Sequence, residues 1–215
     1  MRRGVGARWG TLAAVLMVAA CEARHDRPVA IAVPAVFPPP RPPAGSGPGQ
    51  AVPEPASDGR FVTVNSGVTE QEALWHVRSA LNVAALSCRS QPGGVALVKQ
   101  YNVLLVHRKA VLARAYAAET GRFAMAGKGA VDAHLTRLYN FFAQPSAQPG
   151  FCAAAVDVAD HVDRVPPAGL PHYATGALDR LEAPILDYYR AYDVYRRELA
   201  AWNARSQGRR ADRRP

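Results

Sequence analysis

The sequence predicts an all-α domain over residues 66–203, a bundle of four or five helices held by one disulfide. Three observations support this prediction. First, apolar side chains recur at alternating spacings of three and four residues, the period of a single buried helix face. Second, prolines and glycines separate these segments and supply the breaks between helices. Third, strand-like alternation is almost absent, and only Phe61–Val64 suggests a short extended piece lying over the bundle.

The first predicted helix begins after Thr69. The run from Thr69 to Glu72 has the form of a capping box, in which the threonine hydroxyl and the glutamate carboxylate each bind a backbone N–H that the helix leaves unpaired. The apolar stripe that follows consists of Leu74, Val77, Leu81, Ala84 and Cys88. The sequence Pro92-Gly93-Gly94 then ends the helix.

Three more helices are expected in order. The second should run over about residues 95–118, where apolar residues from Leu97 to Ala115 share one face. The third carries apolar residues at spacings of four, three and four, namely Val131, Leu135, Leu138 and Phe142. The fourth, about residues 150–164, turns Cys152, Ala155, Ala159 and Val162 inward.

The fifth predicted helix has the longest regular period, an unbroken stripe from Leu178 to Trp202. Taken alone, this stripe is a coiled-coil seam that a partner helix would complete. We expect it instead to pack within the chain, so that Tyr188, Tyr192 and Tyr195 are buried against the first and second helices. Pro184 lies inside the stripe and should either kink the helix or begin a new one.

Two cysteines fall on the inward faces of the first and fourth predicted helices. An exported chain enters an oxidising compartment, where Cys88 and Cys152 would form a disulfide. A disulfide between them requires their Cα atoms to lie within about 7 Å of each other. Two separate buried thiols are the alternative.

The N-terminus carries the features of an export signal. Arg2, Arg3 and Arg8 precede an uncharged apolar run of about ten residues, too short to span a bilayer, and small residues follow it. The ending Val18-Ala19-Ala20-Cys21 resembles the lipobox of bacterial lipoproteins. The resemblance implies that residues 1–20 are removed and that Cys21 is lipidated; cleavage as an ordinary signal peptide is the alternative. Glu22 in the next position favours the outer over the inner membrane, by resemblance to lipoprotein sorting signals.

Residues 21–65 are expected to form a disordered, proline-rich linker after the lipidated cysteine. Ten prolines lie between residues 28 and 55, and proline fixes φ and removes hydrogen-bond donors. We interpret the segment as a tether that holds the helical domain away from the membrane. A proline-rich recognition ligand is the alternative, since Pro39 to Pro42 fits the PxxP pattern.

Basic charge is concentrated at the two ends of the chain. The net charge of +9 includes +3 from residues 1–20 and +4 from residues 204–215, so the predicted domain is nearly neutral. We expect residues 204–215 to form a disordered basic tail. Because an exported chain does not meet nucleic acid, the expected partners are anionic lipid head groups, an anionic envelope polymer or an envelope protein. A solvated, frayed end is the alternative for this tail.

No motif predicts a catalytic, cofactor or metal site. Asp157, Asp160 and His161 have ligand-like spacing, and His134 could join them. The first three, however, fall on the helix face away from the core, and Asp160 is placed to pair with Arg164. We therefore expect no metal, no cofactor and no enzymatic activity.

Three stretches of the domain resemble a group of uncharacterised exported bacterial proteins: residues 78–89, 101–105 and 132–152. The resemblance implies a helical domain with a cysteine pair and no assigned activity. The expected function is that of a membrane-anchored lipoprotein of the cell envelope, facing the periplasm, whose helical domain is an interaction or scaffold module. The alternative is a small-ligand-binding or enzymatic domain with a site near Tyr188, Tyr192 and Tyr195.

Overall fold

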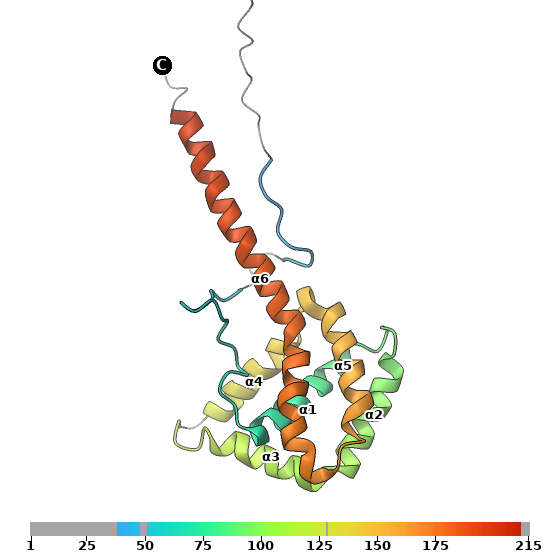
Figure 1. Ribbon diagram of the computed structural model, residues 1–215. Coiled ribbons are helices and arrows are strands. Elements are labelled where there is room, and N and C mark those ends of the chain that lie inside the picture. The colour runs from blue at the N-terminus through green and yellow to red at the C-terminus, as the bar shows by residue number, and fades with distance from the viewer. Residues whose placement is uncertain (1–37, 48–50, 128, 212–215) are drawn as a thin grey trace, which may run out of the picture. The chain divides into compact units, whose positions relative to one another are not determined.

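The computed structural model describes residues 38–47, 51–127 and 129–211. Within the described residues there are six α-helices and no strand: α1 Glu70–Ser87, α2 Gly94–His107, α3 Lys109–Gly121, α4 Ala130–Phe142, α5 Gln148–Val162 and α6 Leu170–Ala211 (Figure 1). The predicted all-α fold with one disulfide is therefore confirmed. The predicted signal peptide and Cys21 fall outside the described residues.

Helix α1 is the centre of the bundle, because it contacts each of the other five helices. The predicted capping box is present: Thr69 Oγ1 accepts from the Glu72 backbone N–H at 3.3 Å, and Glu72 Oε2 accepts from the Thr69 N–H at 2.7 Å. The predicted stripe is fully buried in the core, namely Leu74, Val77, Leu81, Ala84 and Cys88. Burial of this one face fixes the positions of the surrounding helices.

The predicted second helix is in fact two helices, which corrects the expectation of a single helix over residues 95–118. The chain leaves helical geometry at Arg108 (φ −114°, ψ 18°), which separates α2 from α3. The Arg108 guanidinium donates to the backbone oxygens of Asp163 at 2.7 Å and Val165 at 3.2 Å. The break lets α2 pack on α1 and α5 while α3 packs along α1.

Cys88 and Cys152 form the predicted disulfide, with their Cα atoms 5.5 Å apart. Both residues are at most 1% exposed. The bond joins the residue that caps the C-terminal end of α1 to the N-terminal part of α5, and the two cysteines are 64 residues apart in the sequence. In the chain-entropy picture, closing a loop of this length stabilises the folded state by about 4 kcal/mol.

Helix α6 runs unbroken from Leu170 to Ala211 and includes Pro184. The alternative in which Pro184 begins a new helix is therefore wrong. The predicted disordered tail is also wrong for residues 204–211, which are helical, while residues 212–215 lie outside the description. The proline ring fits beside α5 because position 150 is glycine: a Cβ there would lie 2.9 Å from the Cβ of Pro184.

The tyrosine stripe is only partly buried, which corrects the expectation that all three rings lie in the core. Tyr188 is 7% exposed, whereas Tyr192 and Tyr195 are half-buried, and the neighbouring Tyr189 is buried instead. Helix α6 packs mainly on α1 and α5 rather than on α2. The C-terminal part of α6 extends beyond the other helices (Figure 1). Tyr192 still packs against the edge of the core, whereas Tyr195 is not among the residues that do so.

The proline-rich segment contacts the bundle over residues 38–47 and 51–65, where the sequence predicts a disordered tether. Ser46 Oγ is hydrogen bonded to the Tyr188 hydroxyl at 2.8 Å, and Arg196 donates to the backbone oxygens of Val52 at 3.4 Å and Pro53 at 3.2 Å. Phe61 packs its ring on Tyr189, with centroids 5.5 Å apart. The compact unit thus begins at Pro38, earlier than the predicted boundary at residue 66.

The expected extended piece over Phe61–Val64 forms no strand, although Phe61 and Val64 pack against the core. The backbone of this irregular segment is hydrogen bonded to side chains instead: the Asn65 backbone N–H donates to Thr63 Oγ1 at 3.1 Å, and Thr63 Oγ1 donates to Glu182.

Among the described helices, none combines the length and apolar character needed to cross a membrane.

Candidate metal centre

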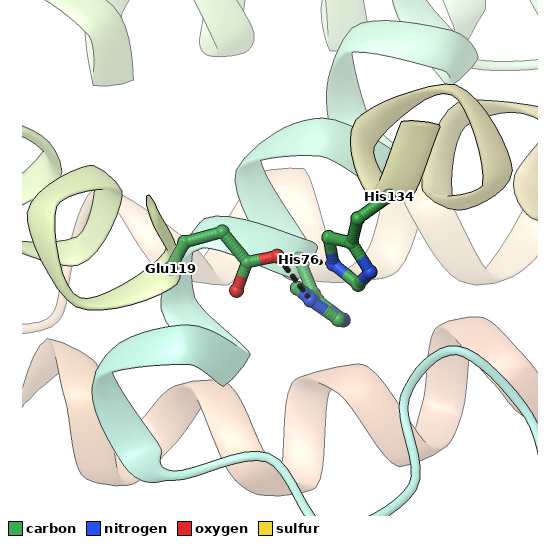
Figure 2. A group of neighbouring side chains, drawn as sticks. All are labelled: His76, Glu119 and His134. Carbon is green, nitrogen blue, oxygen red and sulfur yellow. Dashed lines mark hydrogen bonds and ion pairs between the residues drawn. The ribbon is translucent and has the colours of Figure 1, made fainter. Parts of the chain in front are cut away.

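Three chemically reactive side chains meet in the core. His76 comes from α1, Glu119 from α3 and His134 from α4, and their nearest nitrogen and oxygen atoms all lie within 4.8 Å of one another (Figure 2). The three residues are 0%, 1% and 5% exposed, respectively. Titratable groups are rarely buried so completely unless they pair with one another or bind an ion.

Each of the three residues occupies an inward position of its helix. His76 lies between the buried Ala73 and Ala80 on α1, and Glu119 lies one turn after the buried Ala115 on α3. His134 lies one turn before the buried Leu138 on α4. The break at Arg108 matters here, because it lets α3 pack along α1 and bring Glu119 to His76.

The hydrogen bonds fix how the rings are turned. His76 Nδ1 lies 2.7 Å from Asn65 Oδ1, an amide oxygen that can accept a hydrogen bond from it. His76 Nε2 consequently faces Glu119 Oε1, at 3.2 Å. His134 Nε2 is hydrogen bonded to the same carboxylate oxygen. Two imidazole nitrogens therefore converge on a single carboxylate oxygen, as Figure 2 shows.

The surroundings favour an ionised Glu119 carboxylate and a neutral His134 imidazole. Burial opposes the ionisation of Glu119, but the hydrogen bonds and charges of His76 and His134 outweigh it and lower the pKa of the carboxyl. Burial lowers the pKa of His134, and this effect outweighs the neighbouring Glu119 carboxylate. A deprotonated carboxylate and a neutral imidazole are the states that bind metal ions.

The cluster also contains buried polar atoms that have no hydrogen-bond partner among the described residues. Glu119 Oε2 is buried and has no hydrogen-bond partner among the described residues, and neither has the amide nitrogen of Asn65. A buried acceptor left without a partner costs about 1–3 kcal/mol. A cation bound to the carboxylate would remove that cost.

The donor set suits a first-row divalent cation. Two imidazoles and one carboxylate form one of the known zinc ligand sets, in which three protein ligands leave a fourth position open. Ligand atoms at about 2.0–2.1 Å from a tetrahedral ion lie roughly 3.3 Å apart. His76 Nε2 and Glu119 Oε1 are already 3.2 Å apart. A bound ion would take the place of the hydrogen bond between His134 and Glu119.

One ligand of the cluster is reachable from solution. His134 lines a cavity of about 330 Å³, together with Thr63, Val64, Ser66, Arg122, Phe123 and Arg137. Phe123 stacks on the His134 imidazole, with ring centroids 4.2 Å apart, and holds its orientation. His134 thus borders this cavity, whereas His76 and Glu119 do not line it.

The residues with ligand-like spacing in the sequence are not brought together with His134. Asp157, Asp160 and His161 all lie on the exposed side of α5. The predicted pair of Asp160 with Arg164 is confirmed, with nitrogen and oxygen 2.9 Å apart. His134 lies on a different helix and joins His76 and Glu119 instead.

The sequence analysis missed His76 and Glu119. They are 43 residues apart, and Glu119 is 15 residues from His134, so no short motif joins them. The available signal was each residue's place on the inward face of its helix, where an uncompensated charge would not be tolerated.

Compared with protein families, curated proteins and solved structures, the chain matches none.

Proposed function

We propose that this protein is an exported lipoprotein whose helical domain binds one divalent transition-metal ion, Zn²⁺ foremost, through His76, Glu119 and His134. The observation that carries the proposal is the convergence of two histidine nitrogens on a buried carboxylate that has a second oxygen without a partner. The signal-like residues 1–20 and the lipobox-like Cys21 support the location outside the cytoplasm.

The buried position of the site favours retention of the ion rather than rapid exchange. All three ligands are at most 5% exposed and come from three different helices, so a bound ion would bridge α1, α3 and α4. An ion that binds the folded chain alone adds its binding free energy to the stability of the fold. We infer a role in holding a metal ion at the cell envelope, which requires no catalysis by the protein.

A Zn²⁺ titration of the full-length protein, stripped of metal by a chelator, tests this function. We expect one ion to bind per chain, measured by competition with a colorimetric zinc chelator. His76→Ala and Glu119→Gln should each weaken binding at least about 100-fold, because each removes one of three protein ligands.

The matched controls are His161→Ala and His172→Ala, which remove histidines whose side chains are 52% and 86% exposed. These two variants should bind Zn²⁺ like the unaltered protein. Binding that survives in the Glu119→Gln variant, or that is lost in the His172→Ala variant, would contradict the proposed site.

A second function is favoured by the extension of α6. Its last turns place Tyr195, Leu199 and Trp202 at helical spacing, and residues 194–211 contain five arginines and one acidic residue. A basic amphipathic helix is typical of segments that lie on anionic membrane surfaces. We propose that the extension contacts anionic lipid head groups or an anionic polymer of the envelope, which retains the interaction role expected from the sequence.

Vesicle co-sedimentation distinguishes this second function from the first. Replacing Arg205, Arg209 and Arg210 by Gln should lower the affinity for anionic vesicles by about fivefold per arginine, since each cation near such a surface contributes about 1 kcal/mol. The same variant should bind Zn²⁺ unchanged. Equal binding of the unaltered protein to anionic and zwitterionic vesicles would reject the surface contact.

A further inference from the structure

A second cavity among the described residues is lined by none of His76, Glu119 and His134 and has a different chemical character. It has a volume of about 760 Å³ and lies between the proline-rich segment, α4 and α6. Its apolar wall is formed by Val62, Val64, Phe141, Pro145 and Tyr189. Sites for small organic ligands have volumes of about 300–1,000 Å³ and mostly apolar linings.

Most polar groups along this cavity are already used by the protein itself. The Gln144 side-chain amide donates to the Phe141 backbone oxygen at 2.9 Å and to the Tyr189 hydroxyl at 2.8 Å. Thr63 Oγ1 donates to Glu182. These groups therefore offer little to a polar ligand, and the cavity presents mainly hydrocarbon and aromatic surface.

One end of the cavity carries a cation. Arg137, an exposed residue of α4, lines both this cavity and the smaller cavity beside His134. It makes no hydrogen bond or ion pair with any residue that the structure describes. Arg122 lines the smaller cavity as well, and it forms an ion pair with Glu72 in which nitrogen and oxygen lie 3.8 Å apart.

We propose that this cavity binds a fatty acid, with its acyl chain along Val64, Phe141 and Tyr189 and its carboxylate at Arg137. The apolar wall and the adjoining free guanidinium match the two halves of such a molecule. Thr63 and Val64 also border both cavities, so the head group and the chain occupy adjacent spaces. The proposal does not depend on the metal centre.

Equilibrium dialysis with radiolabelled dodecanoate tests the site. The protein is the full-length chain carrying Cys21→Ser, so that no lipid of its own competes, and a chelator is present throughout. Across octanoate, decanoate and dodecanoate, we expect the affinity to rise by about fourfold per methylene, as for burial of hydrocarbon. An affinity independent of chain length would overturn the proposed acyl site.

The head-group contact is tested by Arg137→Gln. Losing a charge-assisted hydrogen bond should weaken dodecanoate binding by about tenfold, while the uncharged dodecanol should bind the variant and the unaltered protein equally. Arg164→Gln is the matched control, because Arg164 lines neither cavity and pairs with Asp160 on the surface of α5.

The acyl position is tested separately by Val62→Trp, which adds bulk at a cavity-lining residue whose 70% exposure leaves the core intact. This variant should bind decanoate better than dodecanoate, or bind neither, at unchanged melting temperature. Equal loss of dodecanoate and dodecanol in Arg137→Gln, or unchanged dodecanoate binding in Val62→Trp, would contradict the placement of the ligand.

Discussion

Asn65 Oδ1 lies 2.7 Å from His76 Nδ1, within hydrogen-bonding distance, so a residue of the irregular segment before α1 orients the buried imidazole whose Nε2 faces Glu119. Outer hydrogen bonds of this kind orient metal-binding histidines, and their loss typically lowers metal affinity by about 10–100-fold. The geometry therefore makes Asn65 a positioning residue for the proposed centre.

Replacing Asn65 by Ala should weaken Zn²⁺ binding by about 10–100-fold without abolishing it, because the three ligands remain while the His76 ring loses its anchor. Competition titration with a zinc chelator measures the change. Asn82→Ala is a suitable control, since it removes a comparable amide, one that donates to the Tyr101 hydroxyl. A loss in Asn82→Ala as large as in Asn65→Ala would show that general destabilisation, not ring orientation, lowers the affinity.

Replacing both Cys88 and Cys152 by Ala should lower the free energy of unfolding by about 4 kcal/mol, since the disulfide closes a long loop in the unfolded chain. Urea unfolding followed by circular dichroism gives the value. Thiol titration of the unaltered protein under denaturing, non-reducing conditions should find neither cysteine free. Two reactive thiols at this pair would refute the bond.

Truncating the tyrosines of α6 should have graded effects on stability that follow their burial. Tyr188→Ala should cost about 3–5 kcal/mol, because the ring is buried and its hydroxyl is hydrogen bonded to Ser46. Tyr195→Ala should cost less than about 1 kcal/mol, as expected for a half-buried position outside the helix contacts. Thermal or urea unfolding compares the two, and equal losses would contradict the packing described for α6.

Changing Cys21 to Ser should leave the chain unprocessed or release it from the membrane, because the proposed lipid is carried by the cysteine thiol. Membrane fractionation with mass spectrometry of the N-terminal peptide provides the measurement. The unaltered protein should yield a peptide that begins at an acylated Cys21. Recovery of a fully processed, membrane-retained Cys21→Ser form would exclude lipid anchoring at this residue.

The sequence was informative wherever one local pattern decides the structure. The capping box at Thr69, the buried stripe of α1 and the inward positions of Cys88 and Cys152 follow from helical periodicity alone, and the structure confirms them. The break at Arg108 could not be predicted, because neither proline nor glycine marks it and the backbone oxygens that the Arg108 guanidinium contacts lie 55 and 57 residues away.

Long-range packing explains the remaining differences. Residues 38–65 look like a linker because prolines dominate them, yet Ser46, Val52 and Pro53 find partners on α6. The proposed metal centre could not be recognised in the sequence, because His76, Glu119 and His134 come from three helices and share no motif. Local periodicity can show that a glutamate such as Glu119 lies on an otherwise apolar helix face. It cannot show which residues of other helices lie next to that glutamate.

X-ray absorption at the zinc edge of the Zn²⁺-loaded full-length protein tests the proposed metal centre most directly, since it reports the atoms bound to the ion. The account predicts a four-coordinate ion with two imidazole nitrogens and one carboxylate oxygen at about 2.0–2.2 Å. The His76→Ala variant should lose one imidazole contribution, and the His172→Ala variant should not. A spectrum of six oxygen ligands without imidazole, or one unchanged in His76→Ala, would contradict the assignment of the site to His76, Glu119 and His134.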